Sequence, residues 1–263
     1  SPHFFFVPTD FSLLKEYEKF TSVSEIFPLN SRGIETGRDE HLISFGDSEI
    51  KDVIIDIINP ELSNEEIEIR YGIKTTSGWP AEKLRLDLIE SGFNSDLIIP
   101  VYYRPFDWRY TYYSNYLRRT HSKVTKNLIN SNLALISIRQ IVGRESFTHI
   151  GVTNVVAETR VFYSNRSAPV VHPLFIYPEE SSDLLFDFTA TSHWEPDLYH
   201  RNRVPNLNPD FVSTIVENLS LIFDPHLAGW HEEIESTFGP EDILAYIYAI
   251  LHSHTYRDRY DEF

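Results

Sequence analysis

Residues 101–113 read VYYRPFDWRYTYY, in which β-branched and aromatic side chains surround the short segment Arg104-Pro105-Phe106-Asp107. Residues of these types favour strands, and a proline beside an aspartate is typical of a turn. We therefore expect strands at Leu97–Val101 and Arg109–Tyr113 with a turn between them. The two arginines fit two roles. They can bind phosphates or guanine edges, or one of them can pair with Asp107 and fix the turn.

The segments that follow the turn continue the pattern of short strands. Each of them is β-branched or aromatic and is bounded by Pro, Asn, Gly or Ser. The predicted strands are Leu133–Ile138, His149–Val156, Arg160–Tyr163 and Leu174–Tyr177, with a short helix at Ser122–Ile129 before them.

The flanks on both sides are predicted to be mostly helical. Apolar residues recur with helical spacing from Ser48 to Ile58, and Pro80 opens a second helix. Later helices begin at Asn208-Pro209, at Gly239-Pro240 and at a capping box starting with Thr255. We predict an α+β fold, with a mixed β-sheet in the central region, helices packed around it and a helical C-terminal part. Residues 1–263 form one domain, divided into a helical or irregular part (1–96), a basic strand-rich part (97–178) and a helical part (179–263).

The charge is distributed very unevenly along the chain. The 263 residues carry a net charge of −16. Between Pro100 and Val170, however, ten basic residues face only three acidic ones, a net charge of +7 that leaves −23 for the remainder. Such an asymmetry indicates a surface for a polyanion or an acidic partner. The alternative is that basic strands pair with acidic helices inside one fold.

The composition excludes several classes of protein. The absence of cysteine excludes disulfides, thiol catalysis and Cys-containing zinc sites. No phosphate-binding loop, dinucleotide-binding or hydrolase motif is present, and we predict neither catalysis nor metal binding by this chain itself. No membrane span or signal peptide is recognisable, which predicts a cytoplasmic protein.

The basic residues of the central region occur in groups suited to nucleic acid. The segment from Arg118 to Lys126 suits phosphate contact, and arginines that follow a buried strand can reach a groove. Gln140 and Asn165 are candidates for bidentate contacts to adenine. The predicted DNA-binding residues are Arg104, Arg109, Arg118, Arg119, Lys123, Lys126, Arg139, Gln140, Arg144, Asn165 and Arg166.

Several blocks along the chain resemble one known family. The blocks are residues 1–8, 33–39, 103–109 (Tyr-Arg-Pro-Phe-Asp-Trp-Arg), 132–136 with Arg139 and Gln140, 172–178, and 240–253 with Tyr256 and Arg257. In order and spacing they resemble the C-terminal target-recognition (specificity) domain of Type ISP restriction–modification enzymes and related adenine-specific DNA methyltransferases, which serve in bacterial defence.

The resemblance implies a role in holding double-stranded DNA for an adjoining methyltransferase core. That core uses S-adenosylmethionine to methylate a target adenine, and the parent enzyme can also need Mg²⁺ and ATP. The chain lacks methyltransferase motifs and a starting methionine, so we expect it to be a fragment without a cofactor of its own.

Two other hypotheses come from different classes of protein. The acidic flanks could make the chain a protein–protein docking or scaffold module of a larger DNA-processing enzyme. A self-contained nuclease would need a carboxylate cluster with a lysine at metal-site spacing, and the sequence contains no such cluster.

Overall fold

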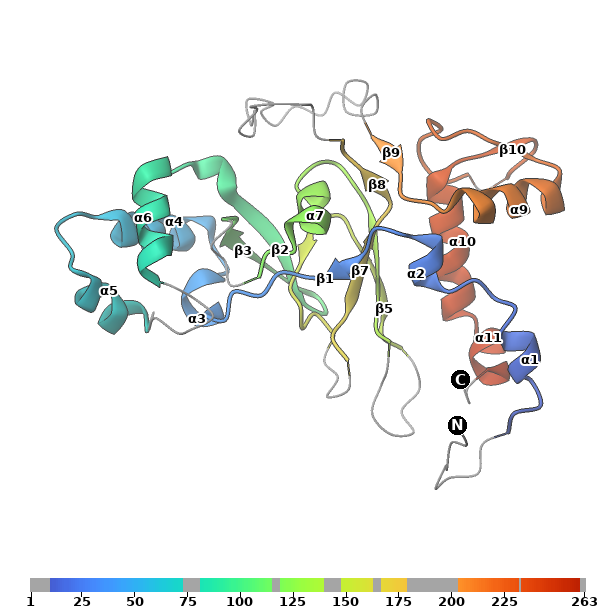
Figure 1. The fold of residues 1–263 in the computed structure, drawn as a ribbon, viewed down its shortest axis with the longest axis horizontal. Helices are drawn as coiled ribbons and strands as arrows, with labels where there is room; N and C mark the ends of the chain where they lie inside the picture. Colours follow the sequence, from blue (N-terminus) through green and yellow to red (C-terminus); the bar gives the residue numbers. More distant parts are fainter. Residues whose placement is uncertain are drawn as a thin grey trace.

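The strand–turn–strand unit lies in the middle of the molecule in the computed structural model (Figure 1). Strand β2 spans Ile98–Arg104 and pairs antiparallel with β3, which spans Asp107–Tyr112. Both strands extend closer to the turn than the sequence predicted, so that only Pro105 and Phe106 connect them. The structure describes residues 10–72, 81–114, 119–139, 148–162, 167–178, 203–231 and 233–260.

One sheet contains four antiparallel strands in the order β1-β7-β4-β5. Their bounds are Ser31–Arg32 (β1), Val170–Pro173 (β7), Ala134–Ser137 (β4) and Ile150–Thr153 (β5). The register places Arg32, Val170, Ser137 and Ile150 in one row across the four strands. This row marks one end of the sheet, because β1 and β4 finish there and β7 and β5 begin there.

The hairpin belongs to a second, mixed sheet in the order β3-β2-β6, with β6 (Val156–Ala157) parallel to β2. Two isolated bridges extend this ladder: Ile34 pairs with Glu158, and Glu35 pairs with Arg119. The segments containing Arg119, Ile34 with Glu35, β6, β2 and β3 therefore lie side by side. The chain around Gly33 joins the two sheets, since β1 ends at the preceding residue.

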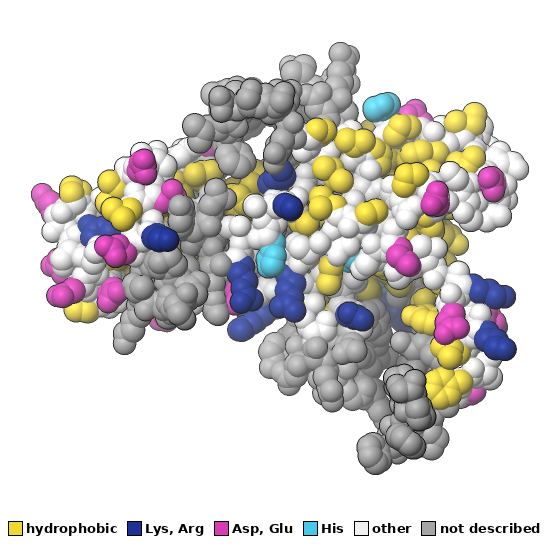
Figure 2. All heavy atoms as spheres, viewed as in Figure 1, with side chains coloured by type: hydrophobic (Ala, Val, Ile, Leu, Met, Phe, Trp, Pro, Cys, Tyr) yellow, Lys and Arg dark blue, Asp and Glu magenta, His cyan; other side chains and the backbone are white. Residues whose placement is uncertain are grey.

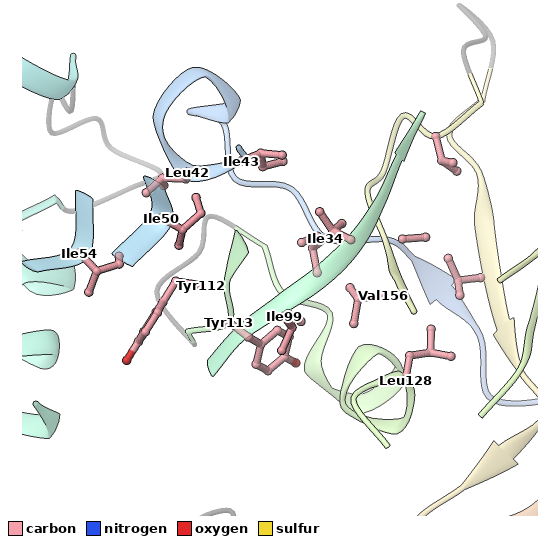
Figure 3. Close-up of a cluster of buried hydrophobic side chains, with 14 of the residues drawn as sticks. Ile34, Leu42, Ile43, Ile50, Ile54, Ile99, Tyr112, Tyr113, Leu128 and Val156 are labelled. Atoms are coloured by element: carbon pink, nitrogen blue, oxygen red, sulfur yellow. The ribbon is translucent and has the colours of Figure 1, made fainter. Parts of the chain in front are cut away.

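Helices of the N-terminal part from α3 onward lie on one side of the hairpin. They are α3 (Asp39–Leu42), α4 (Asp47–Ile58), α5 (Asn64–Tyr71) and α6 (Ala81–Ser91), followed by the short helix η1 (Ser95–Leu97). Helices α1 (Leu14–Tyr17) and α2 (Val23–Ile26) lie beside the C-terminal elements instead (Figure 1). Ile50 and Ile54 of α4 are buried with Ile99 of β2 and Tyr112 of β3 in one apolar core, drawn in Figure 3. The helical spacing of the isoleucines in α4 gives the helix the apolar face that packs there.

A second apolar core lies under the C-terminal elements. These are β8 (Phe175–Ile176), β9 (Val204–Pro205), α9 (Pro209–Leu219), β10 (Ile222–Phe223), β11 (Thr237–Phe238), α10 (Pro240–His252) and α11 (His254–Arg259). Leu135, Phe175 and Leu244 are buried in this core. Asn206 joins distant segments, because its side chain donates to the carbonyls of Leu29 and Pro173 and accepts from the Leu29 amide. Helix α1 lies beside α11 (Figure 1), where Glu16 pairs with Arg259 at 2.8 Å.

The architecture is α+β with a mixed central sheet, as predicted, and most predicted helices are present. The predicted helix at Ser122–Ile129 is α7 (Ser122–Thr125) followed by η2 (Lys126–Leu128). Asn208 caps α9 by accepting from the Asp210 amide at 2.9 Å.

Several local predictions were wrong. Residues 160–162 form a turn instead of a strand, because the Glu158 side chain accepts from the Arg160 amide and its carbonyl accepts from Val161. The predicted strand His149–Val156 is broken, since Thr153 hydrogen-bonds with the backbone of Val155 and separates β5 from β6.

Helix boundaries and several elements also differ from the prediction. The N-cap of α4 is Gly46 instead of Ser48, and α11 is capped by Ser253 instead of Thr255. Within the part predicted to be helical or irregular, residues 10–45 contain α1–α3 and β1. Helix α5 and strand β7 were not predicted.

Candidate nucleic-acid interface

The two arginines of the hairpin are held by carboxylates. Arg104 contacts the fully buried Glu158 at 2.5 Å and lies 3.9 Å from Asp39. Burial raises the pKa of the Glu158 carboxyl, whereas the Arg160 amide and the Arg104 guanidinium lower it. A carboxylate in so apolar a position requires a paired cation. Arg104 therefore stabilises the junction between β2 and the segment after β6.

Arg109 pairs with Asp107 two residues earlier on β3. Its Nη2 lies 2.8 Å from one oxygen of the Asp107 carboxylate, and its Nε donates to both oxygens. The guanidinium also lies over the rings of Phe45 and Tyr103, at 4.3 and 4.2 Å from their centroids. The prediction that Asp107 pairs with one of the hairpin arginines is thus confirmed. The proposed DNA contacts of Arg104 and Arg109 stay predictions.

A different group of cations forms an exposed basic face. Arg119 and Arg32 are both exposed and both lie close enough to His121, the residue that precedes α7, to affect its imidazole. Burial lowers the pKa of the His121 imidazole, and the two arginines lower it further. Glu35 is the carboxylate in this group, 3.4 Å from Arg119.

Lys123 and Lys126 extend the basic face along α7 and η2. Lys123 is exposed and Lys126 half-buried, while Val124, Thr125, Asn127 and Leu128 are buried and anchor the two turns. The Thr125 hydroxyl donates to the Thr120 carbonyl at 2.7 Å. In Figure 2, Lys and Arg side chains gather at and below the position of α7, whereas most Asp and Glu side chains lie toward the two ends of the molecule.

Arg139 lies at the same end of the four-stranded sheet as Arg32. Ser137 and Arg32 belong to the row that ends the sheet, and the exposed Arg139 comes two residues after Ser137. Two strand spacings separate Arg32 from Ser137, so the backbones of these two residues are about 10 Å apart. We call Arg32, Arg119, His121, Lys123, Lys126 and Arg139 the basic face.

Five predicted DNA-binding residues lie outside the described residues. They are Arg118, Gln140, Arg144, Asn165 and Arg166.

Sequence reasoning missed Arg32 and His121. Arg32 lies in the acidic N-terminal part and joins the basic face only because β1 pairs with β7, about 140 residues away along the chain. The available signal was Gly33 directly after it, which permits a close crossing of two backbones. His121 was part of the predicted phosphate-binding segment but was not chosen as a site residue.

Two other kinds of site are absent from the part of the chain that the structure describes. Within them, no group of three or more His, Asp or Glu side chains is arranged to hold a metal ion. Among the helices of the described ranges, none has the length and apolar character needed to cross a bilayer.

The comparisons with known proteins agree with this architecture. The model of the Type ISP C-terminal specificity domain matches residues 25–263, and the chain belongs to this family. The resemblance read from the sequence blocks is therefore confirmed. Among curated proteins, none matches the chain.

Solved structures with the same fold come from much longer proteins. One is described as a cryoEM structure of a DrdV–DNA complex, with a TM-score of 0.55 and 19% identity over 90% of this chain. Another is the ATP-dependent Type ISP restriction–modification enzyme LlaBIII bound to DNA, with a TM-score of 0.58 and 19% identity over 90% of this chain. The chain spans 20% of the first protein and 14% of the second.

Proposed function

We propose that this chain is a DNA target-recognition domain that holds duplex DNA on the basic face. The observation that carries the proposal is the meeting of Arg32 of β1 with Arg119 and Lys123 of one later segment on one exposed surface. Arginine and lysine supply most of the affinity for a phosphate backbone. Membership of the specificity-domain family and the DNA in the structures of DrdV and LlaBIII support the proposal.

The second part of the proposal concerns the polypeptide to which the domain belongs. We infer that the domain positions DNA for an N6-adenine methyltransferase core of a restriction–modification enzyme. S-adenosylmethionine would be the methyl donor of that core, with Mg²⁺ and ATP serving any coupled motor or nuclease. The small share of DrdV and LlaBIII that the chain spans leaves room for such modules in those proteins.

Replacing Arg119 tests the DNA-binding part against a matched control. Arg119 and Arg70 are both exposed, with 53% and 51% of their side chains accessible, and each pairs with one carboxylate. Arg70, however, lies on α5, outside the basic face. In the full-length natural polypeptide, Arg119→Ala is expected to weaken binding to a labelled random-sequence duplex about tenfold at about 0.1 M salt, since one phosphate contact is lost.

The control fixes how the result is interpreted. Arg70→Ala should leave the affinity within about twofold of the wild type, because a surface ion pair contributes little on its own. Fluorescence anisotropy measures both variants. Equal losses for the two variants, or no binding of the duplex by the wild type at low salt, would contradict the proposal.

The docking alternative has an observation of its own. Ile69 on α5 and Leu86 on α6 are 84% and 59% exposed, on helices rich in Asp and Glu. Such a surface suits a basic protein partner and is compatible with DNA binding elsewhere. In the natural polypeptide, Ile69→Lys would then weaken the packing of this domain against another module. Weakened packing with DNA binding intact would favour this second role.

A further inference from the structure

The hairpin presents three aromatic side chains at its surface. Phe106 is 89% exposed, Trp108 is 55% exposed and Tyr110 is 36% exposed. Successive residues of a strand point to opposite faces, so Trp108 and Tyr110 share one face of β3 and Phe106 precedes them at the tip. Large aromatic residues are normally buried, and a group of them at one exposed tip indicates a binding function.

The tip is held rigidly from beneath. Tyr102 stacks on its cross-strand partner Trp108, with ring centroids 5.2 Å apart and planes at 18°. On the other face, Arg104 and Arg109 are paired with Glu158 and Asp107. The charges of the hairpin are therefore neutralised internally, and aromatic surface is what remains for a partner.

The backbone at Phe106 adopts a conformation that phenylalanine disfavours. Its φ angle is +64°, at the second central position of a two-residue turn after Pro105. Glycine is the usual residue there, and a side chain with a Cβ atom is strained in this conformation. The exposed ring gains no packing that would offset this cost. Strain of this kind is retained mainly at functional sites.

The hairpin belongs to the same ladder of strands as Arg119 of the basic face. The bridges place the segment of Ile34 and Glu35, then β6, between Arg119 and β2. Three strand spacings correspond to about 14 Å. The major groove of DNA is about 12 Å wide and admits a two-stranded ribbon. A duplex whose phosphates rest on Arg119 therefore lies within reach of the hairpin.

We propose that the β2–β3 hairpin is a wedge that contacts nucleobases of the bound duplex. This inference rests on the proposed function, since it requires a duplex on the basic face. Phe106 enters the opened base stack, and Trp108 offers a second stacking surface. Apolar side chains of this kind are known to insert between base steps, and base–aromatic stacking is sequence-tolerant. The continuity with the basic face and the internal neutralisation of Arg104 and Arg109 favour bases over a charged protein partner.

The test compares a fully matched duplex with the same duplex containing a short central bubble of mismatches. A wedge must separate stacked bases, and mismatched bases are less costly to separate. The full-length wild type should therefore bind the bubble duplex more tightly. Phe106→Ala should bind both duplexes alike and lose about tenfold in affinity for the bubble. Trp108→Ala should show a smaller loss, and Trp230→Ala, which removes a 70% exposed aromatic on another surface, should show none.

The salt dependence separates this inference from the proposed function. Phe106→Ala should keep the wild-type slope of log affinity against log salt, because no phosphate contact is lost. An unchanged preference for the bubble duplex in Phe106→Ala, with normal binding overall, would overturn the wedge and leave the proposed function standing. If Phe106→Ala kept the wild-type affinity for both duplexes but had a lowered melting temperature, the wedge would also be overturned, and the tip would be assigned to packing against another protein module. Absence of duplex binding by the wild type would instead overturn the proposed function.

Discussion

His172 on β7 is an ionisable side chain placed where its charged form cannot be solvated. It is 1% exposed and packs against the ring of Phe27. Its Nε2 shares a hydrogen bond with the Ser137 hydroxyl at 3.1 Å, and within the described residues Nδ1 has no hydrogen-bond partner. Burial lowers the pKa of the imidazole from 6.5 to about 4. The histidine is therefore neutral in the folded protein at physiological pH.

This lowered pKa predicts a loss of stability in mild acid. The unfolded chain binds a proton at His172 below pH 6.5, whereas the folded chain does so only near pH 4. The free energy of unfolding should therefore fall as the pH decreases through this window, by on the order of 3 kcal/mol from this residue. Urea unfolding between neutral pH and pH 4 measures the effect. In His172→Gln the pH dependence should be shallower than in the wild type, and identical curves would refute the assignment.

At individual residues, the sequence predicted contacts that are local and missed those that depend on distant pairing. The Asp107–Arg109 pair spans two positions of one strand, so its chemistry is visible in a short motif. Arg32 reaches the basic face through the register of β1 on β7. Glu158, the partner of Arg104, is 54 residues away along the chain. Such non-local pairings are set by the whole fold and leave no local pattern.

Among the elements, Gly33 occupies the closest crossing between two segments. A Cβ atom at this position would clash with the Ala157 carbonyl oxygen and lie 2.9 Å from the carbonyl carbons of Ala157 and Glu158. All of these atoms belong to the backbone, so no side chain can rotate away. The Ile34 amide donates to the same Ala157 carbonyl at 2.9 Å. The contact between the chain just after β1 and the end of β6 therefore requires glycine.

Gly33→Ala is expected to destabilise the protein by about 2–3 kcal/mol, because the two backbones must separate. The matched control is Gly46→Ala, whose Cβ meets the Ser48 side chain at an ordinary 3.5 Å and should cost under about 1 kcal/mol. Thermal unfolding of both variants measures the difference. A Gly33→Ala protein as stable as the control would show that the crossing is looser than described.

The elements themselves were predictable where local chemistry defines them. The Asn208-Pro209 and Gly239-Pro240 starts of α9 and α10 rest on capping and on proline at the first helical turn. The strand β7 was missed because Val170-Val171-His172-Pro173 is short and is completed by pairing with β1 and β4 on its two sides. The predicted strand at Arg160–Tyr163 failed for the opposite reason, since the buried Glu158 bends the chain there.

For the whole molecule, the net charge of −16 conceals a separation of charge that the fold preserves. The residues of the basic face lie near the middle of the molecule, while acidic helices such as α4–α6 lie at one end (Figures 1 and 2). The charge pattern along the sequence thus predicted the kind of surface. It did not predict which cations compose it, because two of the predicted residues, Arg104 and Arg109, are engaged by carboxylates.

The salt dependence of duplex binding tests the central claim most directly. If Arg32, Arg119, Lys123, Lys126 and Arg139 each neutralise a phosphate, the slope of log affinity against log salt should be about −4 to −5 for the full-length wild type. Arg32→Ala combined with Lys123→Ala should reduce its magnitude by about 2, since two contacts are removed. A slope that the double variant leaves unchanged would contradict the assignment of DNA to the basic face.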